Sequence, residues 1–286
     1  MDGLQRIPLD PRVSAPVYHI ASTPSTNSLA VELIADQATP TPHMTTVVAT
    51  EQTAGRGRLT RTWTSAPGKG LTATTVLSLP TSLALASSGW LIHACALAVR
   101  DAVDARLARL GRTTHTKWPN DVCVDGTRKI CGILGEVAPA SSPFVNTFVI
   151  GYGVNVSMAD DERPTPEATA LSLEGDQEAA ASPRGTALAL LADILFGLDR
   201  RITGLINADG DPIASGLAHE ATTRCATIGS RIGVADPTDP TGAPQLEGTA
   251  TALSPIGTLV VLLDDGTTTD VSAGDVTPIA NGKHRA

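Results

Sequence analysis

The sequence is poor in aromatic side chains, which make up only 3% of its 286 residues. Its core must therefore be built from Ala, Val, Leu and Ile, within an apolar fraction of 42%. That fraction, at this length, predicts a globular protein with one large domain and a smaller companion. With so few large rings, each tryptophan marks a position worth locating: Trp63, Trp90 and Trp118.

Paired cysteines and long apolar runs are also missing. The four cysteines show neither disulfide-type nor metal-type spacing, so we expect them to be reduced: Cys95, Cys123, Cys131 and Cys225. No run reaches the roughly 18 unbroken apolar residues that a membrane span needs, and no basic segment leads into an apolar one at the N-terminus. These absences predict a cytoplasmic protein with no membrane association.

Acidic residues are absent from one stretch of an otherwise acidic chain. The formal net charge is -8, which argues against general nucleic-acid binding. Residues 52–100 nevertheless contain no Asp or Glu, while they hold Arg56, Arg58, Arg61 and Lys69. A positive field confined to one loop is typical of a site for a small anion.

The hydrophobic pattern predicts an α+β fold with a mixed, largely antiparallel sheet. Residues 1–16 are polar and lead into the first strand. Strands are expected at 17–20, 45–52, 70–80, 121–124, 129–137 and 144–156. Helices are expected after a cap at residues 25–27, at 84–110 with Gly111 ending it, and at 186–203. The acidic segment 158–185, rich in Pro, Ala and Ser, is expected to be a surface loop that includes at most one short turn.

After about residue 218 the pattern changes to short strands and turns. Asp265-Gly266 is a good two-residue hairpin turn between two of these strands. The segment is typical of a small SH3-type β-barrel. We therefore expect two domains, at 1–218 and 219–286.

The stretch "EQTAGRGRLTRTW" (51–63) gathers three arginines around two glycines between two predicted strands. Gly55 and Gly57 let a ligand approach the main chain, and planar guanidinium groups suit carboxylate and phosphate oxygens. The loop is typical of a site for a phosphate-bearing substrate, but a solvated basic loop or an RNA-binding patch fits the spacing equally well. A Walker A loop is excluded at "SAPGKG" (65–70), because Gly70 stands where Ser or Thr is required.

The segment "KWPND" (117–121) places a proline-fixed turn after a predicted strand, exposing Asn120 and Asp121. Such a pair can hydrogen-bond a ribose or hold a hydrated Mg²⁺, although Pro-Asn-Asp is also ordinary turn chemistry. Trp63 is close enough to the arginines to cover a base whose phosphates they hold. The alternative is that Trp63 packs in the core.

Two further segments carry polar groups at the ends of strands. Lys129 precedes the apolar "ICGIL", where its ammonium can polarise a carbonyl or carboxylate oxygen, although most lysines are merely solvated. "GYGVNV" (151–156) puts two glycines and Asn155 at a strand terminus, which suits close approach of the backbone to a ligand or a simple bulge.

Five segments, in their order along the chain, resemble the biotin–protein ligase family. They are "STN" (25–27), "GRGRLTRTW" (55–63), "KWPND" (117–121), "KICGILGE" (129–136) and "GYGVNV" (151–156). The resemblance covers residues 17–206 in motif order, and the C-terminal β segment is similar to the small barrel that such ligases carry. It implies the class II synthetase-like catalytic fold of biotin and lipoate ligases over 1–218 and an SH3-like barrel over 219–286.

The resemblance implies an ATP-dependent biotin–[acetyl-CoA-carboxylase] ligase working in two steps. Biotin and MgATP would form biotinyl-5′-adenylate and pyrophosphate, and the ε-amine of one lysine on a biotin carboxyl-carrier domain would attack the mixed anhydride. Both steps crowd negative charge around one phosphate, where the arginine loop would supply positive charge and close over the adenylate. ATP, Mg²⁺ and biotin are the implied ligands, with no tightly bound prosthetic group.

Functional residues of the family carry over to the matching positions. Lys129 and Arg58 are the implied catalytic residues, and Asp121 is the implied Mg²⁺ ligand. The implied biotin-binding residues are Ser25, Thr26, Asn27, Gln52, Arg56, Gly57, Arg58 and Lys129. The implied ATP-binding residues are Arg58, Arg61, Trp63, Asn120, Asp121 and Asn155.

Some features depart from the family pattern. The spacing between KWPND and Lys129 is one residue longer than in the best-known members, which a hairpin turn at Asp125-Gly126 accommodates. Segment 168–176 matches the family's Ala-Thr-Ser-Leu only loosely and is given no role. Residues 1–16 are too few for the winged-helix repressor domain of many relatives, so we expect no direct DNA binding. An edge strand leaves a homodimer open.

Two rival functions are weighed against this one. A lipoate– or octanoate–protein ligase shares the fold and the adenylate chemistry, and the arginine loop and C-terminal barrel favour biotin over it. A non-enzymatic nucleic-acid-binding module is disfavoured by the acidic balance and the lack of clustered aromatic residues.

Overall fold

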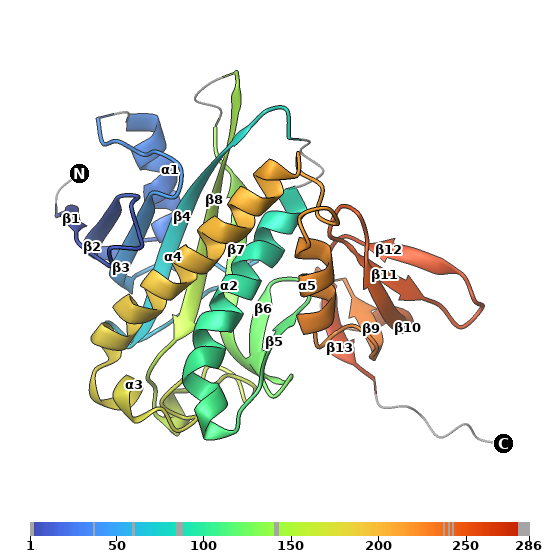
Figure 1. Ribbon diagram of the computed structural model, residues 1–286. Helices are drawn as coiled ribbons and strands as arrows, with labels where there is room; N and C mark the ends of the chain where they lie inside the picture. The colour runs from blue at the N-terminus through green and yellow to red at the C-terminus, as the bar shows by residue number, and fades with distance from the viewer. Residues whose placement is uncertain are drawn as a thin grey trace.

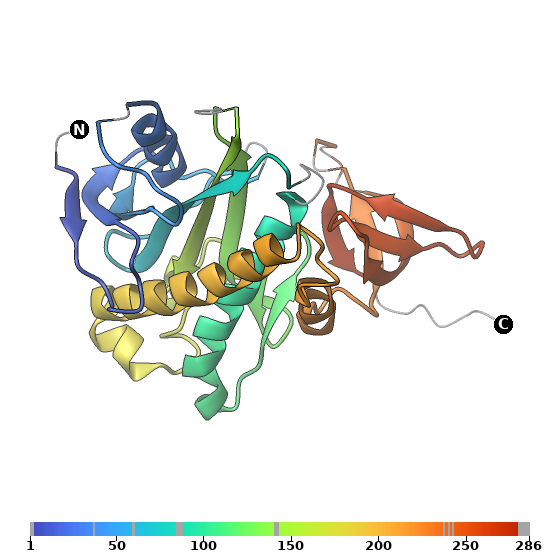
Figure 2. The same cartoon turned by 45° about the horizontal axis from the view of Figure 1, so that its top comes forward.

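The computed structural model describes residues 3–36, 38–58, 61–83, 88–139, 143–236, 238–239, 241 and 243–279. This part of the chain forms one sheet of eight strands and a second sheet of five. Figures 1 and 2 show the second sheet beyond one end of the first, with helix α5 (Leu217–Arg224) between it and helix α2 (Gly89–Leu107). No helix in the described ranges is both long and apolar enough to cross a membrane.

The large sheet has the strand order β1-β2-β3-β4-β8-β7-β6-β5. Its described strand pairs are antiparallel except for β2 and β3, which run parallel. The expected mixed, largely antiparallel sheet is therefore confirmed. The strands are β1 (Gln5–Ile7), β2 (Val17–Thr23), β3 (Thr46–Gln52), β4 (Gly70–Pro80), β5 (Thr114–Lys117), β6 (Asp121–Val124), β7 (Arg128–Val137) and β8 (Val145–Asn155).

Both faces of the large sheet are covered. Helix α1 (Thr26–Asp36) packs Leu33 with Val47 and Val76 on one face, while helices α2 and α4 (Pro183–Asn207) cover the other. Figure 1 shows α2 and α4 lying side by side across the strands. Burial on both sides explains why β3 and β4 are apolar without a simple alternation.

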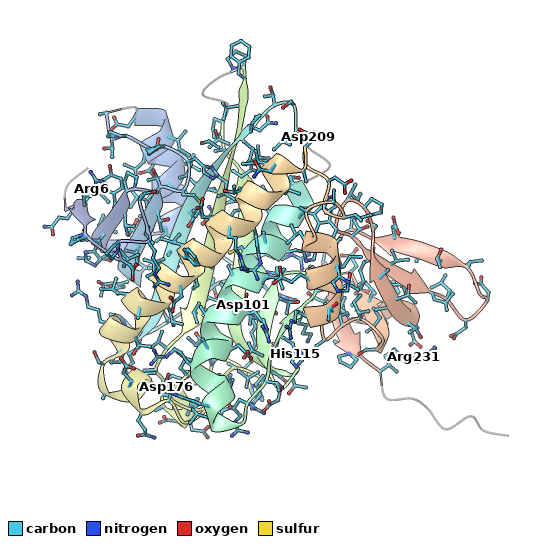
Figure 3. The ribbon with its side chains drawn as sticks, in the orientation of Figure 1. Arg6, Asp101, His115, Asp176, Asp209 and Arg231 are labelled. Atoms are coloured by element: carbon cyan, nitrogen blue, oxygen red, sulfur yellow. The ribbon has the colours of Figure 1, made fainter. Side chains whose placement is uncertain are left out.

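A buried arginine joins helices α2, α4 and α5. Arg201 of α4, 6% exposed, donates to Asp101 of α2 at 2.6 Å and also pairs with Glu220 of α5. Asp101 is labelled between the two long helices in Figure 3. Because a buried guanidinium is costly without partners, this cluster fixes the helices relative to one another.

Most predicted helix positions are confirmed, with shifted ends. The helix expected at 84–110 runs as α2 from Gly89 to Leu107 and continues as a 3-10 turn to Leu110, where Gly111 takes φ = 72°. Residues 84–87 of that prediction lie outside the described residues. The helix expected at 186–203 is longer at both ends, because Pro183 is favourable in the first helical turn.

Two predictions about irregular segments were wrong. The first strand is β1, not the one at residue 17, and three residues are too few to show a period. The segment 158–185 is not all surface loop, because Thr169 and Leu171 are fully buried and helix α3 (Gln177–Ala181) follows them. Its acidic composition hid the buried part, since Glu174 and Asp176 are themselves buried and paired with arginines.

The second sheet has the order β12-β11-β10-β9-β13 and pairs its neighbours antiparallel. The hairpin expected at Asp265-Gly266 is present, but its loop has three residues, since Leu263 N–H donates to Thr267 O across it. Gly266 has φ = 83°, the left-handed position of such a loop. The strands are β9 (Arg231–Ala235), β10 (Pro244–Leu253), β11 (Leu259–Leu262), β12 (Thr268–Val271) and β13 (Asp275–Pro278).

Helix α5 contains the residues at which we place the domain boundary, 218 and 219. It contacts α2 and β5 of the first unit and β10 of the second. Trp118, from the first unit, is packed with Ile232 and Val261 of the second. The two units therefore share an apolar interface, and the division at 218 stays a prediction.

Candidate active site

The floor of one deep cleft is formed by β7 and β8, where glycines leave the sheet bare. Gly132 pairs with Gly153 in the register of the two strands. A Cβ on Gly153 would overlap the indole of Trp63, and one on Gly151 would overlap the amide of Asn27. The glycines therefore let the indole of Trp63 and the side-chain amide of Asn27 lie directly on the sheet. The cleft has a volume of about 380 Å³.

The structure brings together all the predicted site residues except one. The exception is Asn155, which does not line this cleft. The predicted residues that do line it are Ser25, Thr26, Asn27, Gln52, Arg56, Gly57, Arg58, Arg61, Trp63, Asn120, Asp121 and Lys129.

The start of α1 forms one wall of the cleft through three buried polar residues. Ser25 caps the helix with its backbone carbonyl, which accepts from Leu29 N–H at 3.0 Å. The backbone N–H and the hydroxyl of Thr26 both donate to Gln52 Oε1, at 2.8 and 2.9 Å. Gln52 ends β3, so this pair of hydrogen bonds ties the helix to the strand from which the arginine loop departs.

The side-chain amide of Asn27 is satisfied at both ends. Its Nδ2 donates to Glu136 Oε2 at 2.7 Å and to Leu134 O at 3.2 Å. Its Oδ1 accepts from the hydroxyl of Thr74 at 2.6 Å. Thr74 also lies 2.8 Å from the hydroxyl of Thr26. The wall is therefore a continuous hydrogen-bonded group and not a set of separate side chains.

The arginine loop folds back on itself as a small hairpin. Gly57 N–H donates to Arg61 O at 2.8 Å, and Trp63 N–H donates to Gly55 O at 2.9 Å. Arg56 and Thr62 bridge in antiparallel fashion between these two bonds. Residues 59 and 60 lie outside the described residues. The hairpin gives the three arginine side chains different directions.

Two arginines of the loop pair with carboxylates, and the third lies near two of them. Arg56 Nη2 donates to Glu136 Oε2 of β7 at 2.9 Å, and Arg61 forms an ion pair with Asp275 of β13. Arg58 is half-buried in the cleft, and this burial lowers the pKa of its guanidinium, while the charges of Asp275 and Asp121 oppose the shift. The loop is thus folded inward onto acidic partners, not spread as a basic surface.

Trp63 lies flat against the two facing glycines, half-buried at the side of the cleft. Its Nε1 is buried and, among the described residues, has no hydrogen-bond partner. The alternative that Trp63 packs in the core does not hold, because the apolar clusters do not include it and the cleft does. An indole in this place presents an aromatic surface to whatever fills the cleft.

The segment KWPND turns between β5 and β6 through a cis peptide bond at Trp118-Pro119. Asn120 is held by two hydrogen bonds to Ile133. Its side-chain Nδ2 donates to Ile133 O at 2.7 Å, and its backbone carbonyl accepts from Ile133 N–H at 2.9 Å. Asp121 begins β6 and lies 2.7 Å from Lys129 Nζ. The expected turn residues are therefore anchored to β7, the strand that carries the lysine.

The turn between β6 and β7 places Lys129 at the start of its strand. Asp125 and Gly126 have φ of 49° and 76°, the two positive values of a type I′ hairpin turn, as expected from their sequence. The register of β6 against β7 shifts between Val122 and Cys123, where Ile130 of β7 is the additional residue. Lys129 lies opposite Cys123, two residues along β6 from Asp121.

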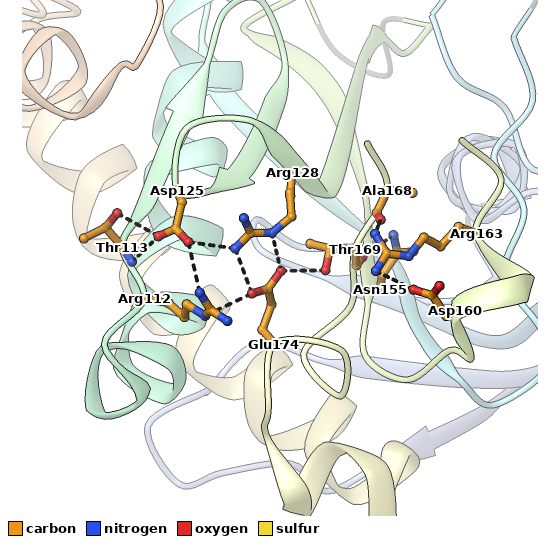
Figure 4. A network of polar contacts seen from close by, with 10 residues as sticks. All are labelled: Arg112, Thr113, Asp125, Arg128, Asn155, Asp160, Arg163, Ala168, Thr169 and Glu174. Atoms are coloured by element: carbon orange, nitrogen blue, oxygen red, sulfur yellow. Dashed lines mark hydrogen bonds and ion pairs between the residues drawn. The ribbon is translucent and has the colours of Figure 1, made fainter. Parts of the chain in front are cut away.

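The segment after β8 holds the backbone of Lys129. Lys129 N–H donates to Glu167 O at 2.7 Å, and Thr169 N–H donates to Lys129 O at 2.8 Å. The hydroxyl of Thr169 donates to the buried Glu174, which accepts from Arg128 Nε as well, both at 2.7 Å (Figure 4). Segment 168–176, to which the sequence assigned nothing, is therefore part of the support of the predicted catalytic lysine.

Asn155 belongs to the same support. It is buried, and its Nδ2 donates to Thr169 O at 2.9 Å (Figure 4). It lines a separate hollow of about 130 Å³ beside Lys69, which pairs with Glu162. Contact between Asn155 and a nucleotide stays a prediction.

The second sheet completes the cleft. Gly274, Asp275, Val276 and Thr277 form the wall opposite α1. The ion pair between Arg61 and Asp275 joins this wall to the arginine loop. Nothing in the local sequence near Asp275 indicates this role, because it depends on how the two sheets pack.

Three other residues of the site were missed in the sequence. Thr74 lies within an apolar strand, and Lys117 was noted only as part of its motif. Glu136 falls inside a quoted motif, and counting alternate positions from Gly132 along β7 would have placed it on the cleft face.

The cleft contains one carboxylate that suits a magnesium ion accompanying a nucleotide. Asp121 lines it, next to Arg58 and Lys129. Across the described ranges, no group of three or more His, Cys, Asp or Glu side chains is placed to hold a metal ion. Since Mg²⁺ is often held by one or two carboxylates together with substrate phosphates, the residues present fit an ion that arrives with its nucleotide.

Comparisons with known proteins place the chain in a family. Residues 19–155 match the Biotin/lipoate A/B protein ligase family. The biotin–[acetyl-CoA-carboxylase] ligase of Mycobacterium tuberculosis (strain ATCC 25618 / H37Rv) is 36% identical over 230 residues, which cover 80% of this chain and 77% of that protein. This chain belongs to the biotin–protein ligase family. The quoted segments lie within the matched residues 19–155, except for the last residue of "GYGVNV".

Solved structures of the family share the fold. The biotin protein ligase of Aquifex aeolicus in complex with biotin and ATP is 20% identical, with a TM-score of 0.66 over 93% of this chain and 98% of that one. The biotin protein ligase of Leishmania major in complex with biotinyl-5-AMP is 26% identical, with a TM-score of 0.51 over 90% and 98% of the two chains. Both sheets of this chain thus belong to the shared architecture.

Proposed function

We propose that this protein is an ATP-dependent biotin–protein ligase that forms biotinyl-5′-adenylate and then transfers biotin to a lysine of a biotin carboxyl-carrier domain. The relative from Mycobacterium tuberculosis is named for biotin and acetyl-CoA carboxylase, and the Aquifex aeolicus ligase binds biotin and ATP. The observation that carries the proposal is the convergence of Lys129, Arg58 and Trp63 on one cleft with the polar wall of α1.

The first step joins a carboxylate to the α-phosphate of ATP. A carboxylate oxygen attacks the α-phosphorus, and the bond to pyrophosphate breaks. Two anionic groups must approach each other, so positive charge at their meeting point lowers the barrier. We assign this work to the ammonium of Lys129 and the guanidinium of Arg58, with Arg56 and Arg61 available from the same loop.

The second step uses the energy stored in the mixed anhydride. The amine of the acceptor lysine attacks the acyl carbon, a tetrahedral oxyanion forms, and AMP leaves with the electrons of the broken C–O bond. Lys129 is the group proposed to stabilise that oxyanion. Arg56, Gly57 and Arg58 are proposed to cover the adenylate and exclude water, which would otherwise hydrolyse it.

The two ends of the substrate would lie on opposite sides of Lys129. Ser25, Thr26, Asn27 and Gln52 are proposed to bind the biotin head, since they supply neutral donors and acceptors at a buried end of the cleft. For the nucleotide we propose Arg58, Arg61, Trp63, Asn120, Asp121 and Asn155. Bound Mg²⁺, held by Asp121 and the phosphates, would neutralise charge on the phosphates.

One assay tests the proposal against its rivals. Exchange of labelled pyrophosphate into ATP is measured with biotin, with lipoate, with octanoate and with no acid. Exchange that depends on biotin alone supports the proposal, and exchange that depends on lipoate or octanoate assigns the lipoate-type activity instead. Absence of exchange with every acid, together with binding of RNA or DNA, assigns the nucleic-acid-binding module.

The loop geometry already disfavours the nucleic-acid rival. A surface for a polyanion needs several cations directed outward. Here Arg56 and Arg61 are paired with Glu136 and Asp275, and Arg58 is half-buried. The positive charge therefore points into a cleft that suits a small ligand.

A further inference from the structure

Six residues form a closed ring of contacts at one end of the cleft: four of them line it, and Thr74 and Glu136 stand outside its lining. From the end of β3, Gln52 accepts from the hydroxyl of Thr26; the hydroxyl of Thr74 lies 2.8 Å from Thr26 Oγ1 and donates its single proton to Asn27 Oδ1. From Asn27 the ring passes to Glu136 and then to Arg56. The backbone of residues 52–56, which leads from β3 into the arginine loop, closes the ring.

Glu136 is the member at which the buried and the exposed parts of the ring meet. A single oxygen, Oε2, accepts from Asn27 Nδ2 at 2.7 Å and from Arg56 Nη2 at 2.9 Å. Its side chain is 31% exposed and that of Arg56 is 46% exposed. An ion pair at such exposure is weak, so the guanidinium can leave it for a stronger anion.

The same oxygen, Glu136 Oε2, also fixes the orientation of the Asn27 side-chain amide. A carboxylate and the carbonyl of Leu134 accept hydrogen bonds and donate none, so only the NH₂ end of the amide can face them. The amide oxygen is thereby directed to Thr74, which donates to it. Without the carboxylate, one carbonyl at 3.2 Å would be left to hold this orientation.

We propose that Glu136 is a positioning residue for adenylate formation, acting through Asn27 and Arg56. It fixes the Asn27 amide in the orientation used to bind the biotin head, and it holds Arg56 beside the cleft until the acyl phosphate draws the guanidinium away. The inference rests on the proposed function for its catalytic part. Its structural part, the holding of the loop by Glu136, stands independently of any substrate.

The structural part is tested on the full ligand-free chain by limited trypsin digestion. Cleavage after Arg56 is followed by the masses of the fragments in the wild type and in Glu136→Gln, Glu136→Ala and Glu178→Gln. Glu178 is a matched control, because it forms an exposed pair with Arg106 away from the cleft. Both Glu136 variants are expected to be cut about fivefold faster, as for loss of one exposed ion pair, with Glu178→Gln unchanged.

The catalytic part is tested by the kinetics of biotin-dependent pyrophosphate exchange. Glu136→Gln keeps an oxygen that accepts from Asn27, so its KM for biotin should rise less than that of Glu136→Ala, for which about tenfold is expected. The KM for biotin of Asn27→Ala combined with Glu136→Ala should equal that of Asn27→Ala alone, because the proposed route from the glutamate to bound biotin runs through the asparagine, whereas Arg56 acts on the acyl phosphate. Circular dichroism and thermal unfolding check that each variant is folded.

The outcomes separate the two proposals. Wild-type protein without biotin-dependent exchange overturns the proposed function, while the digestion still decides whether Glu136 holds the loop. Biotin-dependent exchange with unchanged digestion rates and unchanged KM in Glu136→Ala overturns the inference alone. Additive effects of the Asn27 and Glu136 substitutions on KM would also overturn it.

Discussion

The ammonium of Lys129 lies 2.7 Å from the carboxylate of Asp121, across the β6–β7 pair. The sequence predicts a catalytic role for Lys129 and a magnesium ligand at Asp121, and the hairpin between β6 and β7 brings the two side chains together. Asp121 thus holds the lysine extended along the cleft floor before a substrate enters. A bound carboxylate or phosphate would then share the ammonium of Lys129 with Asp121.

Lys129→Ala should lower biotin-dependent pyrophosphate exchange about a hundredfold or more, the effect of removing one group that stabilises transition-state charge. The fold should persist, because the side chain is 38% exposed and its backbone bonds are unaffected. Lys69→Ala is the control, since Lys69 pairs with Glu162 outside the main cleft. Equal exchange rates in the wild type and Lys129→Ala would remove the lysine from the mechanism.

Gly153→Ala should displace the indole of Trp63, because the added Cβ would overlap it. If the indole lies against adenine, the KM for ATP rises about tenfold, as for loss of one stacking contact. Steady-state exchange with varied ATP measures this, and tryptophan fluorescence reports the displacement. Gly204→Ala serves as the control, since its Cβ would meet open space. A changed fluorescence with an unchanged KM would place adenine elsewhere.

Asp275→Ala should lower the KM for ATP about two- to fivefold. Its carboxylate pairs with Arg61 in the cleft and would compete with phosphate for the same guanidinium, at the strength of a partly exposed pair. The KM is measured at low and moderate salt, where screening should narrow the difference. Asp193→Ala, which loses a pair with Arg12 far from the cleft, is the comparison. A higher KM would instead make Asp275 part of the binding surface.

Glu174→Gln should lower the free energy of unfolding by about 2 kcal/mol near neutral pH, since charged hydrogen bonds to Arg128 and Thr169 are weakened. Burial raises the pKa of Glu174, but these hydrogen bonds and the charges of Arg128 and Arg112 outweigh it, and the pKa lies below its ordinary value of 4.5. A lowered pKa means that the stabilisation is complete above that ordinary value and is lost as the pH falls through the folded-state pKa.

Urea unfolding at about pH 7 and in acid, below about pH 4, measures this pH dependence. The difference between the wild type and Glu174→Gln should shrink in acid. Glu178→Gln, whose side chain is 62% exposed, should show little difference at either pH. A difference that is the same at both pH values would mean that the charge of Glu174 does not contribute.

Local patterns predicted the elements that support the site. Alternation and apolar runs located β3, β4, β7 and β8 to within a residue or two, and the Asp125-Gly126 turn was readable because both residues tolerate positive φ. They failed for β1 and for the buried part of 158–185, where acidic residues are neutralised by distant arginines such as Arg106 and Arg128.

The sequence by itself determined which chemical groups this protein has and on which strands and loops they lie, because backbone propensity and hydrophobic period are local properties. It also determined the family, through the order of five short segments. Only the tertiary structure decided that Glu136 would join Asn27 to Arg56, that Asp275 would face Arg61, and that Asn155 would support Lys129 from behind. These pairings depend on how strands and sheets far apart in the chain pack together, and no local pattern records that packing.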